Sequence, residues 1–415
     1  MKQRRTSRYV AGVVALGFVV AACGGDDDDA TPAEATAEET TEATSEATGE
    51  MSEDSGEMSE ESGEMSEETA EAVAIDLAGV CPDPLVIQTD WWTESEHGAM
   101  YEMIGDDYVV DADNKITSGS MIAGGEPTGI TLEVRAGGPA IGFNAPRVNM
   151  YTDDSIHIGY TSTDGQAQNW EDAPLIAVVA PLEKNPQIVM WDPETYPDIE
   201  TIADLGEAGV SVNLFGGAPG FPEAFVALGI WTEDMIDKSY DGTPARFIAE
   251  GDIAQQGFAS AEPYLYKNTF EEFGRDVAFQ LLHDAGYQVY SQALGVKPTD
   301  LETLRPCLEQ FVPIVQQATI DFAKDPARTN AMIVDVVEQF NADWVYNEGV
   351  AAFAAETMTE LEIHGNGPDS TVGNFDLDRA NELINTIRDA GAEVPADLTA
   401  EDMYTNEFID ESIGF

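Results

Sequence analysis

An acidic stretch near the N-terminus limits where this chain can fold. From Asp26 to Glu71 the sequence holds 19 acidic residues, no lysine or arginine, and no aromatic residue. This composition offers too little apolar surface to offset the entropy lost when a chain becomes ordered. We therefore expect residues 23–73 to form a self-repelling, disordered tether, and a folded domain must lie in the residues that follow.

A seven-residue repeat occurs within this tether. It reads Gly-Glu-Met-Ser-Glu-Asp-Ser at 49–55, Gly-Glu-Met-Ser-Glu-Glu-Ser at 56–62 and Gly-Glu-Met-Ser-Glu-Glu-Thr at 63–69. A coiled coil needs two apolar positions in each heptad, and this repeat has only Met. We interpret it as part of the tether; the alternative is a tail that binds cations.

The first 22 residues have the pattern of an export signal. Four basic residues precede an uncharged, largely apolar run from Tyr9 to Ala22, and Cys23 follows. The run is too short for a membrane span. Its charged start, short apolar centre and small residues before a cysteine resemble the bacterial lipoprotein signal, in which the cysteine takes a lipid. We predict that residues 1–22 are removed and that lipidated Cys23 anchors the protein to the outer face of the cell membrane; an ordinary secretory signal is the alternative.

The remaining chain is strongly acidic. Residues 73–415 hold 60 of the 79 acidic and 14 of the 18 basic residues, a net charge of −46. A surface of this sign repels nucleic acid and anionic lipid, so we expect neither as a partner.

Short apolar segments alternate with helical periodicity in this acidic part. Strands are expected at 85–89, 130–135, 157–160, 175–180, 187–190, 210–214, 255–259 and 288–294, and helices at 301–323, 327–355 and 378–390. This alternation predicts an α/β architecture with mostly parallel sheets and a helical C-terminal third. Roughly 340 residues suit two lobes better than one core.

Two cysteines remain besides Cys23. They are Cys81, just before the first expected strand, and Cys307, in the first helix after the last one. Outside the cytoplasm we expect them to form a disulfide; free buried thiols are the alternative.

Five segments occur in an order that points to a family. They are Thr-Asp-Trp-Trp-Thr-Glu-Ser-Glu-His-Gly at 89–98, Ala-Gly-Gly-Pro at 136–139, Ile-Gly-Tyr at 158–160, Ile-Glu-Thr-Ile-Ala-Asp-Leu at 199–205 and Ala-Glu-Gly-Asp-Ile at 249–253. In this order the chain from residue 85 to 415 resembles the type II solute-binding proteins of ABC importers. The resemblance is to the branch that takes up thiamine-precursor pyrimidines, riboflavin, alkanesulfonates or nitrate.

The resemblance implies a two-lobed type II periplasmic-binding-protein clamshell. Lobe one would comprise residues 82–182 and 292–415, lobe two residues 183–291, with crossovers near 181–192 and 287–296. Ligand would lie in the cleft at the carboxyl ends of strands, and its binding would favour the closed form. The implied partners are a small molecule and ABC permease subunits; we expect a monomer without a cofactor.

Candidate ligand-binding residues in lobe one follow its strands. Trp91 and Trp92 offer a stacking platform for a flat ring, although one of them is expected to pack in the core. His97 can hydrogen-bond a ligand heteroatom or start a helix. Gly137 and Gly138 allow close backbone approach or form a tight turn.

Further candidates follow later strands. Gly216 and Gly217 lie in a turn before an apparent helix, whose free N–H groups would point into the cleft. Glu262 and Tyr264 follow the last apolar strand of lobe two, and Asp164 follows a strand of lobe one; each faces the cleft or belongs to a rim turn.

The aromatic candidates set the expected ligand class. With Trp91, Trp92, Tyr160 and Tyr264 near the cleft, we expect a planar heteroaromatic ligand, of the thiamine-precursor pyrimidine or flavin type. Alkanesulfonate or nitrate is the alternative, but the loops that bear these candidate residues contain no lysine or arginine that would bind an anion.

Enzymatic activity finds little support in the sequence. Fungal relatives of this fold make the thiamine pyrimidine with a cysteine-rich iron loop, which this chain lacks. Its four histidines have no metal-ligand spacing, and Gly-x-Ser-x-Gly is absent from the sequence. We expect no catalytic residues and no metal; a ligand-sensing lipoprotein without a transporter is the further alternative.

Overall fold

The computed structural model describes residues 75–415 except 216–219 and 343. The predicted signal peptide, Cys23, the tether and the pair Gly216 and Gly217 therefore lie outside the described residues. No helix in the described part is long and apolar enough to cross a membrane.

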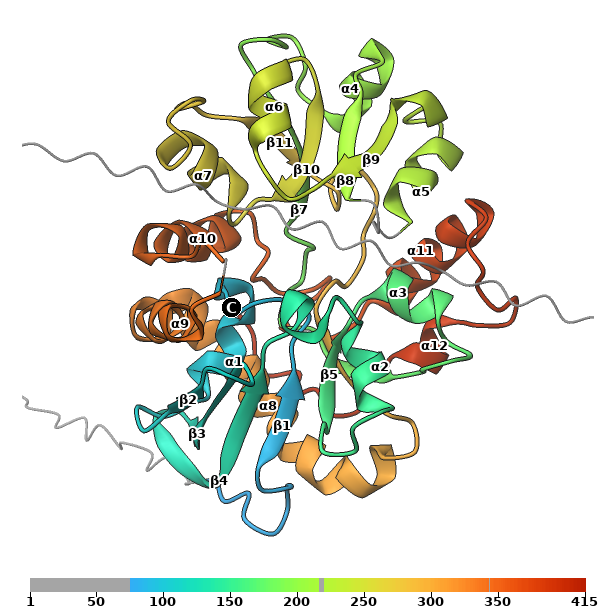
Figure 1. Ribbon diagram of the computed structural model, residues 1–415. Coiled ribbons are helices and arrows are strands. Elements are labelled where there is room, and N and C mark those ends of the chain that lie inside the picture. The colour runs from blue at the N-terminus through green and yellow to red at the C-terminus, as the bar shows by residue number, and fades with distance from the viewer. Residues whose placement is uncertain (1–74, 216–219, 343) are drawn as a thin grey trace, which may run out of the picture. The chain divides into compact units, whose positions relative to one another are not determined.

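Seven strands form the first sheet, in the order β2-β3-β4-β1-β5-β12-β6. Figure 1 shows the first five of them side by side in this order. β1 pairs in parallel with β4 and β5, whereas β12 runs antiparallel to β5 and β6. β2 and β3 extend the edge beside β4 as antiparallel strands. The bounds are β1 Leu85–Gln88, β2 Val109–Asp111, β3 Ile116–Ala123, β4 Glu126–Arg135, β5 Ile158–Thr161, β6 Ile176–Val179 and β12 Ala293–Val296.

Five strands form the second sheet, in the order β11-β7-β10-β8-β9. β8 pairs in parallel with β9 and β10, and β7 runs antiparallel to β10 and β11. The bounds are β7 Gln187–Trp191, β8 Val212–Phe215, β9 Ile236–Tyr240, β10 Ala254–Phe258 and β11 Ala278–Leu281.

The two sheets repeat one topology. We leave out the β2–β3 extension and number the other strands of each sheet in chain order, without the antiparallel crossover strand. Each sheet then has the order second, first, third, crossover strand, fourth, which is β4-β1-β5-β12-β6 in one and β9-β8-β10-β7-β11 in the other. The antiparallel strand, β12 or β7, is in each case the strand that the chain enters after crossing from the other sheet. The predicted two-lobed α/β fold is confirmed by these two sheets and two crossovers; the exact lobe boundaries remain a prediction.

The expectation of mostly parallel sheets is wrong. Six of the ten strand pairs are antiparallel. The crossover strands account for four of them, because a strand that enters from the opposite lobe runs against its neighbours. The hairpins of β2, β3 and β4 account for the other two.

Helices cover both sheets and fill the predicted helical C-terminal part, which is confirmed. The expected helix at 327–355 is two helices, because Asn341 adopts a left-handed conformation with φ 45° and ends the first. The bounds are α1 Gly98–Glu102, α2 Pro146–Met150, α3 Thr163–Gln168, α4 Ile202–Ala208, α5 Phe221–Ala227, α6 Ala245–Glu250, α7 Glu262–Asn268, α8 Leu301–Lys324, α9 Ala327–Phe340, α10 Glu348–Glu360, α11 Leu377–Asp389 and α12 Ala400–Met403, with 3₁₀ turns η1 Ser95–His97, η2 Gly138–Ile141 and η3 Glu233–Met235.

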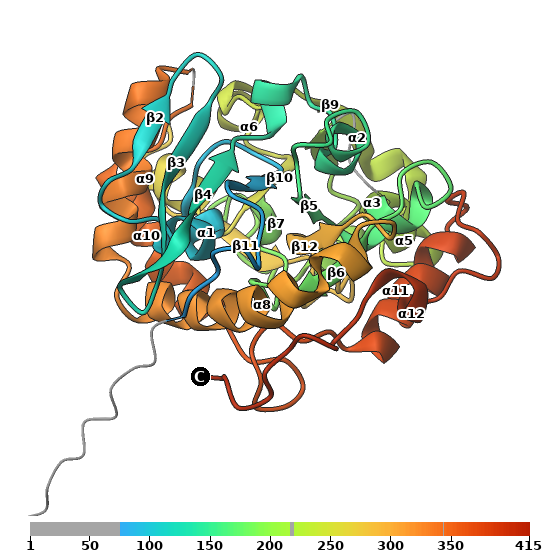
Figure 2. The same cartoon turned by 90° about the horizontal axis from the view of Figure 1, so that it is seen from below.

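The C-terminal helices contact both lobes. α8 lies along the first sheet, with α9 and α10 to one side and α11 and α12 to the other (Figure 2). Ala354 and Met358 of α10 share a buried cluster with Met190 of β7, and Leu383 of α11 shares another with Phe225 of α5. Two helical supports therefore join the second lobe to the first.

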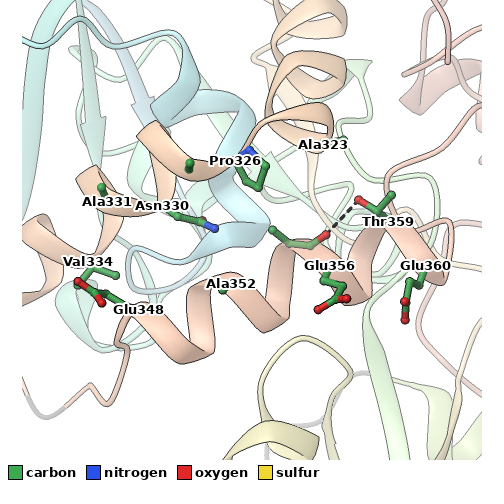
Figure 3. Close-up of a pocket in the computed structure, with 12 residues that line it drawn as sticks. Ala323, Pro326, Asn330, Ala331, Val334, Glu348, Ala352, Glu356, Thr359 and Glu360 are labelled. Atoms are coloured by element: carbon green, nitrogen blue, oxygen red, sulfur yellow. Dashed lines mark hydrogen bonds between the residues drawn. The ribbon is translucent and has the colours of Figure 1, made fainter. Parts of the chain in front are cut away.

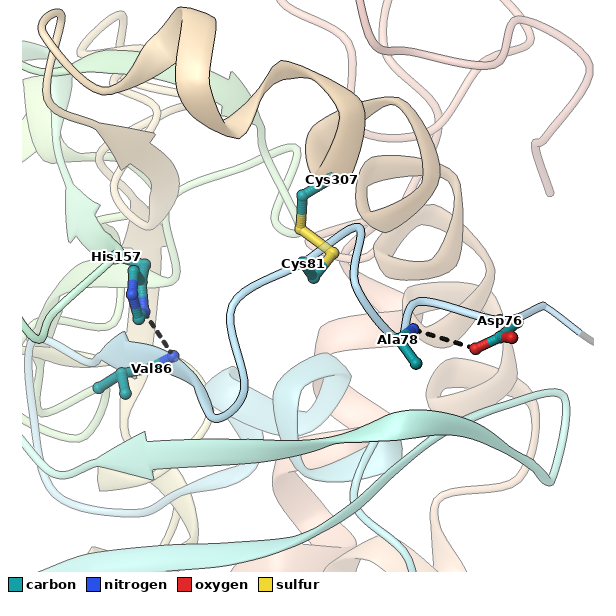
Figure 4. The surroundings of a disulfide bond; sticks show 6 residues. All are labelled: Asp76, Ala78, Cys81, Val86, His157 and Cys307. Carbon is teal, nitrogen blue, oxygen red and sulfur yellow. Dashed lines mark hydrogen bonds between the residues drawn. A yellow bond between two sulfur atoms is a disulfide. The ribbon is translucent and has the colours of Figure 1, made fainter.

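The predicted disulfide is confirmed. Cys81 and Cys307 are bonded, with their Cα atoms 4.7 Å apart, and join the segment before β1 to α8 (Figure 4). Both residues are buried. The bond therefore fixes the start of the first lobe to the helix that covers its sheet.

Candidate functional site

A pocket of about 240 Å³ lies where three neighbouring strands of the first sheet end. Loops after β4, β1 and β5 line it, together with one residue of the second crossover. Because the carboxyl ends of parallel strands meet at one edge of a sheet, these loops converge there. The lining residues are Asp90, Trp91, Gly138, Phe143, Asn144, Ala145, Pro146, Arg147, Tyr160, Thr161, Ser162 and Ser291.

Aromatic side chains form one wall of this pocket. The Trp91 ring lies 5.9 Å from the Phe143 ring and 6.2 Å from the Trp344 ring, centroid to centroid. Gly138 has φ +55°, and a Cβ atom there would lie 2.5 Å from the Trp91 ring. Only glycine therefore allows the loop after β4 to sit against the indole.

A carboxylate held from behind forms a second part of the pocket. Asp90 Oδ1 lies 2.9 Å from His97 Nε2 and accepts a hydrogen bond of 3.4 Å from Gln292 Nε2. His97 is fully buried, and its ring meets the Tyr160 ring edge-on at 5.1 Å. His97 and Gln292 thus fix the orientation of Asp90, whose Oδ2 receives no hydrogen bond from the described residues.

Arg147 supplies a positive charge to the same pocket. It belongs to α2, which Pro146 starts. Its Nε is buried and has no hydrogen-bond partner in the described part of the chain. Burial lowers the pKa of the Arg147 guanidinium, an effect that the charge of Asp164 opposes.

Several buried polar atoms in or next to the pocket lack a hydrogen-bond partner among the described residues. The Tyr160 hydroxyl, Ser291 Oγ and Gln292 Oε1 make no hydrogen bond within the described residues. Tyr160 is 1% exposed, and burial raises the pKa of its hydroxyl well above the usual value. Because buried polar groups in proteins are nearly always hydrogen-bonded, these atoms indicate a place for ligand polar groups or water.

Other candidates from lobe one lie behind the pocket. Trp92 packs against the core of the first sheet. Gly137 donates its N–H to Trp91 O at 2.7 Å and to Thr89 Oγ1 at 3.1 Å, so it ties two loops together. Asp164 accepts hydrogen bonds from Tyr287 Oη at 2.8 Å and Gly165 N at 2.7 Å. These residues support the loops that bear Trp91, Gly138 and Tyr160.

The candidates from lobe two lie at a contact between the lobes. Glu262 begins α7 and accepts the N–H of Phe258 at 2.7 Å. The Tyr264 ring lies 5.6 Å from the ring of Phe353 in α10. Ser260, just before α7, donates a hydrogen bond to Glu96 of the first lobe. The loop after β10 therefore contacts the first lobe without lining the pocket.

Three carboxylates lie at this contact, of which Glu94 and Glu96 are buried and Glu262 is half-buried. Burial, reinforced by neighbouring carboxylates, raises the pKa of Glu94 well above its usual value. Burial also raises the pKa of Glu96, although its bond from Ser260 opposes the change. Burial raises the pKa of Glu262 to about 7. Contact between the lobes thus places acidic groups where protonation is favoured.

Three pocket residues, Asp90, Phe143 and Arg147, were not among the candidates predicted from the sequence. Asp90 directly precedes the tryptophan pair at the end of an apolar strand, which was an available signal. Arg147 lies nine positions after Gly138. The chain between them contains the turn η2, and both residues line the pocket. The pocket thus contains a basic residue, whereas the loops predicted from the sequence to line the cleft contain none.

A larger pocket of about 640 Å³ lies beside α9 and α10 (Figure 3). Much of its lining is alanine, and Glu348, Glu356 and Glu360 lie along it. Its one amide, Asn330, is already bonded to Ala351 O at 3.0 Å and to Ser95 Oγ at 2.9 Å. With few polar groups available to orient a small molecule, this pocket is the weaker candidate. No group of three or more metal-ligating side chains occurs among the described residues.

No protein-family model and no curated protein matches the sequence. Solved structures similar to this chain include the ligand-binding component of an ABC-type import system from Staphylococcus aureus, with zinc bound (10% identity, TM-score 0.48, 79% of this chain and 98% of that one). The periplasmic aliphatic sulphonate-binding protein SsuA from Escherichia coli has 12% identity and a TM-score of 0.48 over 77% of this chain and 92% of that one. The alkanesulfonate-binding protein SsuA from Xanthomonas axonopodis pv. citri, bound to MOPS, has 12% identity and a TM-score of 0.45 over 78% and 100%.

Proposed function

We propose that this protein is the extracytoplasmic solute-binding component of an ABC importer. Lipidated Cys23 would anchor it, the tether would carry it above the membrane, and the two lobes would close around a small planar heteroaromatic molecule. The observation that carries the proposal is the pocket at the ends of β4, β1 and β5. It has an aromatic wall and buried polar atoms without hydrogen-bond partners in the described part of the chain. ABC permease subunits would receive the closed form.

The pocket volume favours one ligand type within this class. About 240 Å³ lies below the roughly 300–1,000 Å³ typical of sites for drug-sized molecules. A single pyrimidine ring stacked on Trp91 suits this volume better than the three fused rings of a flavin. The Tyr160 hydroxyl would then hydrogen-bond a ring nitrogen or an exocyclic amine.

Contacts between the lobes support closure as the binding step. Ser260 reaches Glu96 across the lobes, and Tyr264 packs near α10. A ligand that gains contacts from both lobes only in the closed form shifts the population toward it. Gly216 and Gly217 remain candidates for contacts from the second lobe.

A thermal-shift screen of the chain from residue 24, refolded free of carried ligand, tests this function. Ligands would be pyrimidines, thiamine, riboflavin, alkanesulfonates and nitrate. At 100 times its Kd a ligand stabilises the folded state by about 2.7 kcal/mol, which raises the Tm by about 2 °C or more. Trp91→Ala should abolish the shift. Trp92→Ala should lower the Tm of the free protein but keep the shift, because Trp92 packs in the core.

One observation favours a second candidate ligand class. Arg147 lies in the pocket without a hydrogen-bond partner among the described residues, and an alkanesulfonate or nitrate ion would pair with it. A shift with these anions alone would overturn the heteroaromatic assignment and keep solute binding. No shift with any compound would favour a ligand-sensing lipoprotein, or a protein of another function.

A further inference from the structure

Two charged side chains of the pocket define the ligand more closely. We propose that the pocket takes a zwitterion: a small planar molecule with a protonated amine or amidine for Asp90 and a carboxylate, sulfonate or phosphate for Arg147. This inference rests on the proposed function, because it concerns the same pocket. Asp90 and Arg147 both line that pocket but form no ion pair with each other.

Arg147 differs from every other arginine of the described residues. Each of the other seven donates a hydrogen bond to a carboxylate or a carbonyl of the protein. Arg147 makes none, although acidic residues outnumber basic ones about fourfold in this part of the chain. A guanidinium presents five N–H donors in a fixed fork that matches a carboxylate or a phosphate. An acidic group of the ligand would satisfy the buried Nε of Arg147.

The Asp90 carboxylate is held by a buried histidine and a glutamine. His97 Nδ1 is buried and has no hydrogen-bond partner among the described residues, so a second ring N–H would be left without an acceptor. A ring proton is therefore best placed on Nε2, which lies 2.9 Å from Asp90 Oδ1 and donates to it. Gln292 donates to the same oxygen, which directs Oδ2 to the ligand. His97 and Gln292 act here as positioning residues.

The remaining lining fits the body of such a ligand. Trp91, Phe143 and the bare backbone of Gly138 offer flat apolar surface between the two charges. A ligand with only a positive group would leave Arg147 without a partner. A ligand with only a negative group would be repelled by the carboxylate of Asp90. Specificity for the zwitterion therefore arises from repulsion as well as attraction.

Three probes with the same ring test this inference: benzylamine, benzoate and 4-(aminomethyl)benzoate. Their Kd values would be measured by titration calorimetry on the chain from residue 24. We expect the zwitterion to bind at least about 10-fold more tightly than either single-charge probe. Asp90→Asn and Arg147→Gln should each weaken its binding by about 10-fold to 100-fold. Asp154→Asn and Arg305→Gln, which remove the same charges from outside the pocket, should leave its Kd unchanged.

Two outcomes would overturn the inference and leave the proposed function intact. One is an uncharged heteroaromatic from the screen that binds wild type, Asp90→Asn and Arg147→Gln equally. The other is a single-charge probe that binds as tightly as the zwitterion. Failure of every probe and every screened solute would overturn both the inference and the proposed function. Circular dichroism of each variant would establish that it is folded.

Discussion

The two sheets carry matching groups at matching strand ends. An aromatic residue lies at or just beyond the end of the first strand of each sheet: Trp91 after β1, and Phe215 as the last residue of β8. A left-handed glycine follows the second strand, Gly138 after β4 and Gly242 after β9, and in each sheet it lies near that aromatic ring. One topology thus brings the same residue types together twice.

The two sheets differ in what surrounds these groups. Asp164, after the third strand of the first sheet, accepts hydrogen bonds from Tyr287, Ser162 and Gly165. Glu262, at the matching place after β10, has one backbone donor and a raised pKa. The shared topology decides where a site can form, and the local side chains decide whether that place becomes a pocket or a contact between lobes.

Removal of the disulfide should lower the free energy of unfolding more than any other change proposed below. It should also destabilise the first sheet more than the second. Cys81→Ser with Cys307→Ser opens a loop of 226 residues, and loop entropy puts the loss of unfolding free energy at up to about 5 kcal/mol. Denaturant unfolding of wild type and double variant measures it. Amide exchange should rise more in β1 and α8 than in β8 and β10, and equal rises would contradict the assignment of the bond to one lobe.

The matched glycines allow a sharper test. Both have positive φ, so alanine at either position should cost about 1 kcal/mol from the backbone. At Gly138 the new Cβ would also lie 2.5 Å from the Trp91 ring, whereas at Gly242 it would lie 3.6 Å from the Phe215 ring. Gly138→Ala should therefore lose about 1–3 kcal/mol more than Gly242→Ala and weaken ligand binding. Equal losses of Tm would show that the contact with Trp91 can relax.

The smallest expected effect concerns pH. Between pH 4.5 and about 7 the unfolded chain has lost the Glu262 proton and the folded chain keeps it, so this group lowers stability as pH rises through that window. Because Glu262 is partly exposed, we expect about 1 kcal/mol. Glu262→Gln should remove this decline in a series of Tm values against pH.

Glu302→Gln serves as a control, because the contribution of Glu302 to stability changes with pH in the opposite direction. The hydrogen bond from Arg305 lowers the pKa of the Glu302 carboxyl, so this group adds stability above the usual pKa and loses it as pH falls. Parallel pH curves for both variants would contradict the raised pKa of Glu262.

Local signals in the sequence were sufficient to predict much of the architecture. The buried strand Leu85–Gln88 and helices α8 and α11 lie where apolar periodicity predicted them. Strands β2, β3, β9 and β11 were not predicted, because partly exposed strands lack a continuous apolar run. The expected strand at 288–294 begins only at Ala293, since the preceding residues belong to the crossover.

The sequence alone determined the α/β class, the helical C-terminal part and the cysteine pair, because each follows from composition or local periodicity. Only the tertiary structure decided that Trp91 lines the pocket while Trp92 packs in the core, since neighbouring side chains diverge once the loop is placed. It also brought Asp90 and Arg147 into one pocket although 57 positions separate them. No local pattern encodes such a pairing, because it depends on the order of β4, β1 and β5 in the sheet.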